Sequence, residues 1–235
     1  MNINIFVWSK KVIMDGKLFA NLVLLIIFVY AAMGNLMAWG FNKTNWVPLT
    51  KPLLMPVLAI YYVLNAVNIE WILVAALFFA FLGDVFLIWP KKKLFFIGGL
   101  VFFLVMQILY IVFIATRQLN SGNFSVAVMA AAIVFLFVGG LVYFKLYKSL
   151  NEMKIPVLVY ILMLITAGFL CFMYMTGNFN RFSFIQFAGS LFFIGSDTIL
   201  AFETFKGPLR LANVWIMATY INAQLLLFAG FLNTY

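Results

Sequence analysis

The sequence consists mainly of long, continuous apolar runs separated by short polar stretches. A helix needs about 20 apolar residues to cross the hydrocarbon core of a membrane. When the chain is divided where charges, Pro and Gly gather, it shows eight such runs, at approximately 18–38, 51–67, 70–89, 94–115, 124–144, 155–175, 182–205 and 210–233. A membrane β-barrel would instead show segments of alternating apolar and polar residues. The runs therefore predict an all-α membrane protein with eight transmembrane helices.

The composition supports this prediction and excludes several classes of protein. Of the 235 residues, 67% are hydrophobic and only 9% are charged, whereas soluble domains carry roughly 25% charged residues. The net charge of +9 therefore indicates loops that face anionic lipid headgroups, and no nucleic-acid partner is expected. The chain has no His and a single Cys, Cys171. This excludes His-dependent nucleophiles, His-ligated or Cys-cluster metal sites and an intrachain disulfide, so no metal or other cofactor is expected.

The short connections predict one transmembrane domain over residues 18–235, preceded by an interfacial stub at 1–17. If all eight runs cross the membrane, the odd-numbered loops share one side, which holds ten basic residues: Lys43, Lys51, Lys91, Lys92, Lys93, Lys145, Lys148, Lys154, Lys206 and Arg210. The other side holds Lys10, Lys11, Lys17, Arg117 and Arg181. This excess places the odd-numbered loops in the cytoplasm and both termini outside, whereas the basic stub argues for the opposite orientation.

The two halves of the chain, about 18–115 and 124–233, resemble each other. The third and seventh runs each carry a small residue, an Asp and a Leu in the same order, as Gly83-Asp84…Leu87 and Ser196-Asp197…Leu200. The second and sixth runs both open with a Lys and a nearby Pro, and the fourth and eighth each pair a Tyr with a Gln. Because four runs separate the copies, we expect two parallel four-helix repeats related by an axis along the membrane normal.

Asp84 and Asp197 are the only acidic residues deep inside apolar runs. An ionised Asp at the bilayer centre costs about 2.5–3.5 kcal/mol on insertion scales. Every Lys and Arg lies near a loop, so neither Asp is expected to have an intramembrane cation. Burial without a cation favours a protonated carboxyl, which is the form that a general acid requires. The alternative is a structural role, in which hydroxyls such as Thr198 or Tyr220 bind the two Asp side chains.

Further polar residues complete a candidate site. Both Asp residues lie about 10 Å below the same membrane surface at 1.5 Å per residue. Gln107 with Tyr110, and Tyr220 with Gln224, are three and four residues apart, so each pair shares a helix face. If all these groups line one site, it is an elongated cavity, which is the shape of a lysolipid. Lys51 stands beside Pro52, and its ammonium either extends to the interface or meets a lipid phosphate.

Several of these motifs, in the same order along nearly the whole chain, resemble those of the YhhN-like lysoplasmalogenase family. They are Lys51-Pro52-Leu53, Gly83-Asp84 with Leu87, Pro156-Val157-Leu158-Val159-Tyr160, Ser196-Asp197-Thr198-Ile199-Leu200-Ala201, and Tyr220 with Ala223-Gln224. The resemblance implies an eight-span hydrolase, multi-pass in a bacterial inner membrane, that cleaves the vinyl ether of lysoplasmalogens, a class of lysophospholipid. It further implies Asp84 and Asp197 as catalytic carboxylates, with Lys51, Tyr160, Ser196, Tyr220 and Gln224 lining the site. Where a His is expected before Tyr110, this chain has Gln107, which cannot transfer protons.

The chemistry fits these residues. A vinyl ether hydrolyses by proton transfer to its β-carbon, which gives an oxocarbenium ion that water captures. One protonated carboxyl can supply the proton, and a second, ionised one can stabilise the cation and orient the water. A proton-coupled transporter or lipid flippase is the alternative, since midplane carboxylates in parallel repeats also suit transport. A membrane scaffold without chemistry is a third reading, and it leaves both Asp residues unexplained.

Overall fold

The computed structural model describes residues 2–89, 92–119 and 125–232, and within these ranges it contains helices, turns and no strand. This confirms the predicted all-α class. The long helices are α1 (Asn2–Gly40), α3 (Leu54–Asn65), α4 (Trp71–Phe86), α5 (Lys93–Phe113), α6 (Val126–Leu146), α7 (Lys154–Gly177), α8 (Arg181–Lys206) and α9 (Ala212–Leu232). Short helical turns connect or extend them: η1 (Thr44–Trp46), α2 (Val47–Thr50), η2 (Lys51–Leu53), the π-helical η3 (Ile114–Gln118), η4 (Tyr147–Ser149) and η5 (Asn151–Met153).

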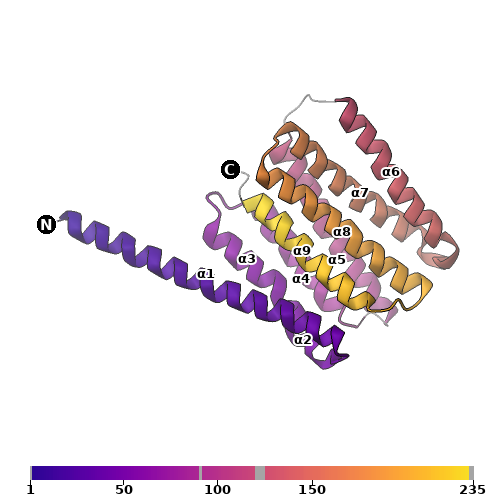
Figure 1. The fold of residues 1–235 in the computed structure, drawn as a ribbon, viewed down its shortest axis with the longest axis horizontal. Helices are drawn as coiled ribbons and strands as arrows, with labels where there is room; N and C mark the ends of the chain where they lie inside the picture. The colour runs from indigo at the N-terminus through magenta and orange to yellow at the C-terminus, as the bar shows by residue number, and fades with distance from the viewer. Residues whose placement is uncertain (1, 90–91, 120–124, 233–235) are drawn as a thin grey trace.

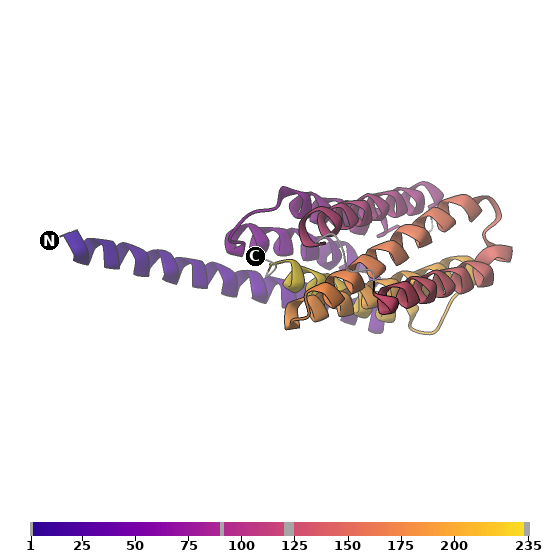
Figure 2. The same cartoon turned by 90° about the horizontal axis from the view of Figure 1, so that it is seen from above.

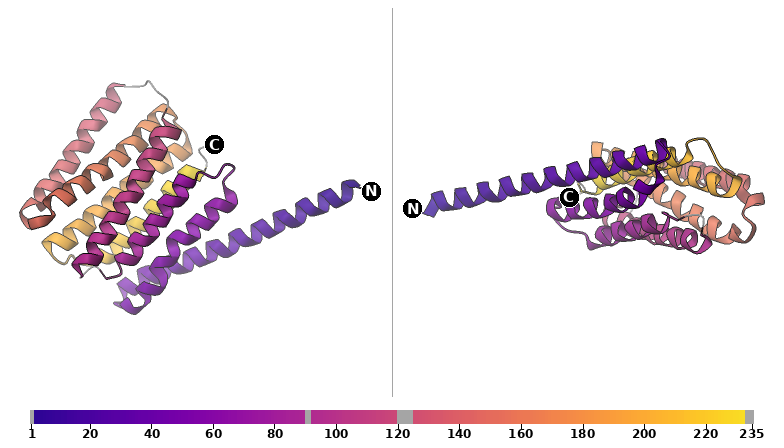
Figure 3. Two further views of the ribbon diagram at one scale, coloured as in Figure 1. Left: turned by 180° about the vertical axis from the view of Figure 1, so that it is seen from behind. Right: turned by 90° about the horizontal axis from the view of Figure 1, so that it is seen from below.

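The helices form a two-layered bundle from which one helix projects. Seen from above, α3, α4 and α5 form one layer and α6 to α9 form the other (Figure 2). From behind, α3, α4 and α5 lie side by side (Figure 3). The C-terminal part of α1 packs against α3 and α9, whereas its N-terminal part extends beyond the bundle (Figure 1). Residues 2–17 of the predicted stub continue into α1 as one helix, and their interfacial location stays a prediction.

The helices suit a membrane. Seven helical segments of the described ranges are long and apolar enough to cross one, and α4 is a further apolar helix of 16 residues. Helices α1 and α6 expose large apolar side chains such as Leu18, Val126 and Phe144. Water would disfavour so much contiguous apolar surface, whereas lipid does not. The chain is therefore a multi-pass integral membrane protein.

Polar side chains fasten the helices to one another at three places that the sequence analysis did not identify. Asn21 of α1 and Asn65 of α3 exchange two amide hydrogen bonds, of 2.9 and 2.8 Å. Gln118 and Gln186 exchange another two, of 3.0 and 2.8 Å, between η3 and α8. Asn35 donates to Thr50 Oγ1 at 3.1 Å and so joins α1 to α2. Inside a membrane such bonds help to hold helices together, because an apolar side chain gains little from contacting another helix instead of lipid.

Helices α8 and α9 approach each other closely at Gly189. A Cβ atom at this position would lie 2.7 Å from the backbone N of Leu227 and 3.0 Å from the backbone O of Ala223. Glycine is therefore required for this backbone-to-backbone contact. The contact fixes how α8 presents Asp197 relative to Tyr220 on α9.

Candidate active site

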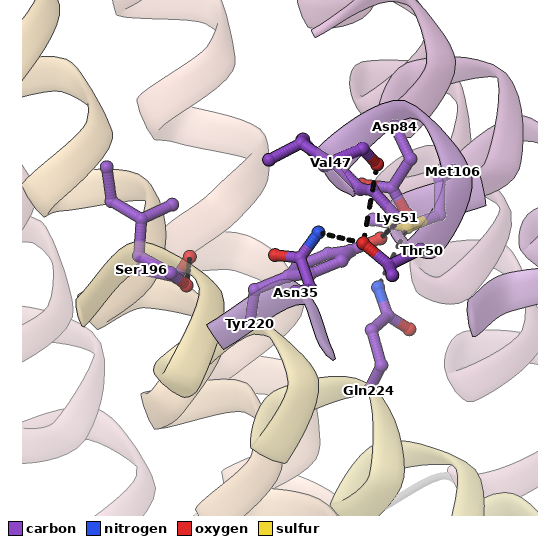
Figure 4. A network of polar contacts seen from close by, with 10 residues as sticks. Asn35, Val47, Thr50, Lys51, Asp84, Met106, Ser196, Tyr220 and Gln224 are labelled. Carbon is purple, nitrogen blue, oxygen red and sulfur yellow. Dashed lines mark hydrogen bonds and ion pairs between the residues drawn. The ribbon is translucent and has the colours of Figure 1, made fainter. Parts of the chain in front are cut away.

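Asp84 lies near the end of α4 with 1% of its surface exposed, and two residues from other helices bind it. The Tyr220 hydroxyl donates a hydrogen bond to Asp84 Oδ2 at 2.9 Å. The Lys51 Nζ atom lies 3.6 Å from Asp84 Oδ1. Figure 4 shows Lys51, Asp84 and Tyr220 together. The expectation that neither Asp has an intramembrane cation is therefore wrong for Asp84.

Lys51 reaches Asp84 because the chain does not enter the second apolar run as a straight helix. Three short turns, η1, α2 and η2, lead from α1 to α3, and Lys51 begins the last of them. Its neighbour Thr50 is fixed by Asn35 and by a hydrogen bond of 2.9 Å to the Trp46 carbonyl oxygen. Lys51 is 8% exposed. In this structure its ammonium thus pairs with a carboxylate instead of extending to the interface.

Asp197 lies on α8 and is partly buried. Its Oδ2 atom accepts a hydrogen bond of 2.5 Å from the Tyr160 hydroxyl on α7 and a longer one of 3.5 Å from Gln107 Nε2 on α5. Among the described residues, the ion pairs found do not include Asp197. The two carboxyl groups therefore have different environments: one faces an ammonium and a phenol, and the other faces a phenol and an amide.

The contacts of the two Asp residues follow the same pattern. Asp84 binds Lys51 from its own half of the chain and Tyr220 from the other half. Asp197 binds Tyr160 from its own half and Gln107 from the other. In each case the first partner belongs to the apolar run before that of the Asp: Lys51 lies just before α3, and Tyr160 lies on α7. The second partner lies on the helix that follows the Asp of the other half: Tyr220 on α9, and Gln107 on α5. The cross-contacts couple the halves at both carboxyl groups.

Aromatic rings pack around Tyr220, the phenol that binds Asp84. Tyr220 packs edge-to-face on Phe103, with ring centroids 5.7 Å apart, and contacts Phe193 at 6.0 Å. Tyr220 also lies within electrostatic range of both Asp84 and Asp197. Gly83 allows this arrangement, since a Cβ there would lie 2.8 Å from the Phe103 ring. Phe103 and Phe193 were missed in the sequence because they belong to apolar runs in which any Phe can face lipid.

Three other predicted site residues have structural partners. The Tyr110 hydroxyl donates to Gln224 Oε1 at 3.0 Å, and Gln224 Nε2 lies 3.5 Å from the Met106 sulfur. Ser196 donates to the Ile216 carbonyl oxygen at 3.1 Å, so it joins α8 to α9. Figure 4 shows Ser196 apart from the cluster around Asp84. The structure therefore brings Lys51, Asp84 and Tyr220 together, and Gln107, Tyr160 and Asp197, but adds Ser196 to neither group.

Asp197 and Tyr160 face an apolar cavity between α4–α5 and α6–α8. The cavity is narrow, with a volume of about 40 Å³. Its walls are mostly aliphatic and aromatic, and its polar lining residues are Tyr160, Asp197 and Thr198. A second, smaller cavity of about 20 Å³ lies on the other side of Leu164, next to Gln107 and Tyr110. Asp84 lines neither of these two cavities, and a single elongated site that holds all of the polar groups stays a prediction.

This arrangement is suited to proton transfer on an apolar molecule. A carboxyl group in an apolar wall can exchange a proton with a bound substrate while water is largely kept out. Within the described ranges, no group of three or more His, Cys, Asp and Glu side chains is placed to hold a metal ion. The polar groups in the cavity wall are the Asp197 carboxyl and the hydroxyls of Tyr160 and Thr198, and the Gln107 amide reaches Asp197 from the neighbouring cavity.

The chain is similar in sequence to several known proteins. It is 30% identical over 189 residues to lysoplasmalogenase TMEM86B of Rattus norvegicus, and the matched region covers 79% of this chain and 73% of that protein. It is 28% identical over 155 residues to lysoplasmalogenase TMEM86A of Bos taurus, covering 64% and 61%. No solved structure matches the chain significantly. The sequence profile of the YhhN family matches residues 46–231 and so includes both Asp residues and the side chains that bind them, Lys51, Gln107, Tyr160 and Tyr220. The chain belongs to the YhhN family.

Proposed function

We propose that this protein is a membrane hydrolase that cleaves the vinyl ether bond of a lysoplasmalogen, releasing a fatty aldehyde and a glycerophospho-alcohol. The observation that carries the proposal is Asp197, a carboxyl group in the wall of an apolar cavity with a phenol as its close partner. Relatives that are named lysoplasmalogenases support the same activity. The substrate is a lysophospholipid taken from the surrounding membrane lipids.

In the proposed reaction Asp197 is the proton donor. Its protonated carboxyl transfers a proton to the β-carbon of the vinyl ether, and the double-bond electrons form the new C–H bond. The resulting oxocarbenium ion is attacked by water at its α-carbon, and the Asp197 carboxylate accepts the proton that water releases. The hemiacetal then collapses to the aldehyde and the glycerol hydroxyl. One water molecule is consumed and Asp197 is regenerated.

Tyr160 and Gln107 orient the Asp197 carboxyl in this scheme. Both bind the same oxygen, Oδ2, so the other oxygen is available to the cavity. Gln107 cannot accept or release a proton under ordinary conditions, and its role is to position the carboxyl group. Its own Oε1 atom has no hydrogen-bond partner among the described residues, which makes it a suitable acceptor for the attacking water.

Asp84 has the second, electrostatic role. Its carboxylate faces the Lys51 ammonium and binds Tyr220, and Tyr220 lies within electrostatic range of Asp197. The Lys51 ammonium offsets part of the Asp84 charge, and the remainder acts through Tyr220 on the cation that forms in the cavity. Because Asp84 does not line the cavity, we propose that it stabilises the cation from behind the aromatic layer instead of touching the substrate.

The proposal includes a membrane topology. All eight apolar helices cross a bacterial inner membrane, in two parallel repeats of about 18–115 and 124–233. The equivalent contacts of Asp84 and Asp197, each with one partner from either half, support this relationship between the halves. Helix α4 has only 16 residues and is about 24 Å long at 1.5 Å per residue, so the turn that follows it completes the crossing.

The test is an aldehyde-release assay on the purified protein in detergent. The substrates are a lysoplasmalogen and its saturated alkyl-ether analogue, which has no double bond to protonate. We expect aldehyde from the vinyl ether alone. Asp197→Asn and Asp84→Asn are then compared with the unmodified protein. Full activity in both variants, each shown to be folded, would overturn the proposed mechanism.

A further inference from the structure

A further hollow lies at the end of the bundle where α5 begins and α7 begins. Its volume is about 450 Å³, and it has a more polar wall than the cavity that holds Asp197. Three segments line it: the start of α5 (Lys93, Phe96 and Ile97), the 149–153 turn before α7, and the end of α8 (Thr204 and Phe205). We call this hollow the mouth. Figure 1 shows the α6–α7 turn and the end of α8 at the same end of the bundle.

The mouth and the Asp197 cavity share two lining residues, Phe96 and Phe205. The two rings pack edge-to-face with centroids 5.9 Å apart, so they form a partition between the two spaces. Asp197 precedes Phe205 by eight residues on α8, which places the carboxyl group about 12 Å deeper along the helix axis. A molecule that spans the partition therefore has one part at Asp197 and another in the mouth.

The mouth carries one positive and one negative group. Lys93 Nζ and Glu152 Oε2 form an ion pair of 2.9 Å, and their side chains are 71% and 83% exposed. An exposed pair of this kind contributes little to stability because water screens it, so a ligand with both charges can replace it at little cost. Asn151, with φ of 45°, turns the chain just before Glu152, a conformation that Asn tolerates better than most residues.

Glu152 is unusual for this end of the molecule. The surrounding loops carry mainly Lys and Arg, and the nearby Glu203 is engaged by the backbone N–H of Leu209 at 2.5 Å. A site for a phosphate alone would not benefit from a carboxylate in its wall, because like charges repel. The combination of Lys93 and Glu152 fits a zwitterion that carries a phosphate and an ammonium.

We propose that the mouth binds the zwitterionic headgroup of the lysophospholipid, with Lys93 contacting the phosphate and Glu152 the ammonium. The Phe96 and Phe205 rings move apart so that the glycerol crosses the partition, and the vinyl ether then lies beside Asp197. This inference rests on the proposed function, and it adds the residues that select the headgroup. Since neither charged residue is buried, their replacement leaves the fold intact.

The experiment compares three alkenyl substrates: one with phosphoethanolamine, one with phosphate alone and one with free glycerol. For Lys93→Gln we expect KM to rise about threefold to tenfold for the two phosphate substrates, as suits one exposed charge contact, and to stay unchanged for the alkenylglycerol. For Glu152→Gln we expect the rise only with phosphoethanolamine. Lys148→Gln is the matched control, since Lys148 is exposed at the same end but does not line the mouth.

Two results would overturn the inference while the proposed function stands. One is an active protein in which Lys93→Gln behaves like Lys148→Gln. The other is an equal rise of KM for all three substrates, which would indicate general damage instead of headgroup contact. Failure of the unmodified protein to release aldehyde from any of the three would instead overturn the proposed function, and this inference with it.

Discussion

Tyr220 on α9 donates a hydrogen bond of 2.9 Å to Asp84 on α4, 136 residues earlier in the chain. The bond joins the first half of the molecule to the second at a buried carboxylate. The same phenol packs against Phe103 and Phe193 and also interacts electrostatically with Asp197. The relationship makes Tyr220 the most direct probe of whether Asp84 and Asp197 act together.

Tyr220→Phe removes this hydrogen bond and keeps the ring. The expected cost in folding free energy is about 1.5–3 kcal/mol, since the lost bond goes to a charged acceptor. If the hydroxyl also stabilises the transition state by about 1.4–2.7 kcal/mol, kcat falls roughly tenfold to a hundredfold. Aldehyde release and Tm in detergent measure the two effects. Tyr30→Phe, at an exposed position of α1, is the control; a Tyr220→Phe variant that matches it in both readouts contradicts the prediction.

Lys51→Met leaves the Asp84 carboxylate without its ammonium partner. Breaking a buried ion pair in this way costs about 3–5 kcal/mol, because one charge remains buried without compensation. The double variant Lys51→Met with Asp84→Asn removes both charges, so we expect it to recover most of the lost stability but not the activity. Thermal unfolding of Lys51→Met, Asp84→Asn and the double variant gives a double-mutant cycle, which isolates the interaction between the two side chains. Equal Tm values for Lys51→Met and the unmodified protein would show that the pair is not formed in the membrane.

Asp197→Asn replaces the proposed acid with an amide of the same shape. General acid–base catalysis contributes about 10²- to 10⁴-fold to a rate, so we expect kcat to fall by a factor in this range. Tm should change little, because Tyr160 can still donate to the amide oxygen. Tyr160→Phe is expected to lower kcat less, since it leaves the carboxyl in place. Retention of more than half of the activity by Asp197→Asn would exclude it as the proton donor.

Ala201→Phe fills part of the cavity that holds Asp197, since Ala201 belongs to its lining. We expect a substantially higher KM for long-chain lysoplasmalogen in a protein that still inserts and folds. Leu191→Phe on the same helix is the control, because Leu191 is 46% exposed on the outer surface. Substrate kinetics distinguish the two. If both variants keep normal kinetics, the alkenyl substrate binds elsewhere.

Gly189→Ala tests the close approach of α8 and α9. The added Cβ meets backbone atoms of α9 at 2.7 and 3.0 Å, so the helices must separate, at an expected cost of about 1–3 kcal/mol. Gly195→Ala on the same helix is the matched control, because its Cβ meets nothing within 4 Å. The expected difference appears as a lower Tm for Gly189→Ala alone. Equal Tm values would mean that the helices shift without cost.

The sequence predicted the helices well because continuous apolar runs leave few other possibilities. The second apolar run was expected to start at Lys51, and a short helical turn begins at this residue. The sequence analysis did not predict that this turn brings Lys51 to Asp84. Periodicity predicts which residues share a face of one helix, such as Gln107 and Tyr110, but not which neighbouring helix that face meets. The pairing of Asp84 with Lys51 depends on three successive short turns, whose path is set by contacts with α1.

The sequence analysis named the polar residues of the candidate site but did not predict most of the contacts between them. Charged and amide groups are conspicuous in apolar runs, so Asp84, Asp197, Gln107 and Gln224 could be identified from the sequence. Tyr220 was named in advance as a hydroxyl able to bind an Asp, and it does bind Asp84. Ser196 follows the same sequence logic but binds the Ile216 backbone. Short side chains next to an Asp can face either way, and only packing decides the direction.

The two partners of Asp84 become available at different times during synthesis. Lys51 lies earlier in the chain than Asp84, so the first half can enter the membrane with its acid already neutralised by an ammonium. Tyr220 is made 136 residues later, and Asp197 obtains Tyr160 only when the second half follows. A chain arrested midway through translation therefore has the Lys51–Asp84 ion pair but lacks Tyr160, Asp197 and Tyr220. Under the proposed mechanism, the complete set of acidic and phenolic groups assembles only after the second half of the chain has been made.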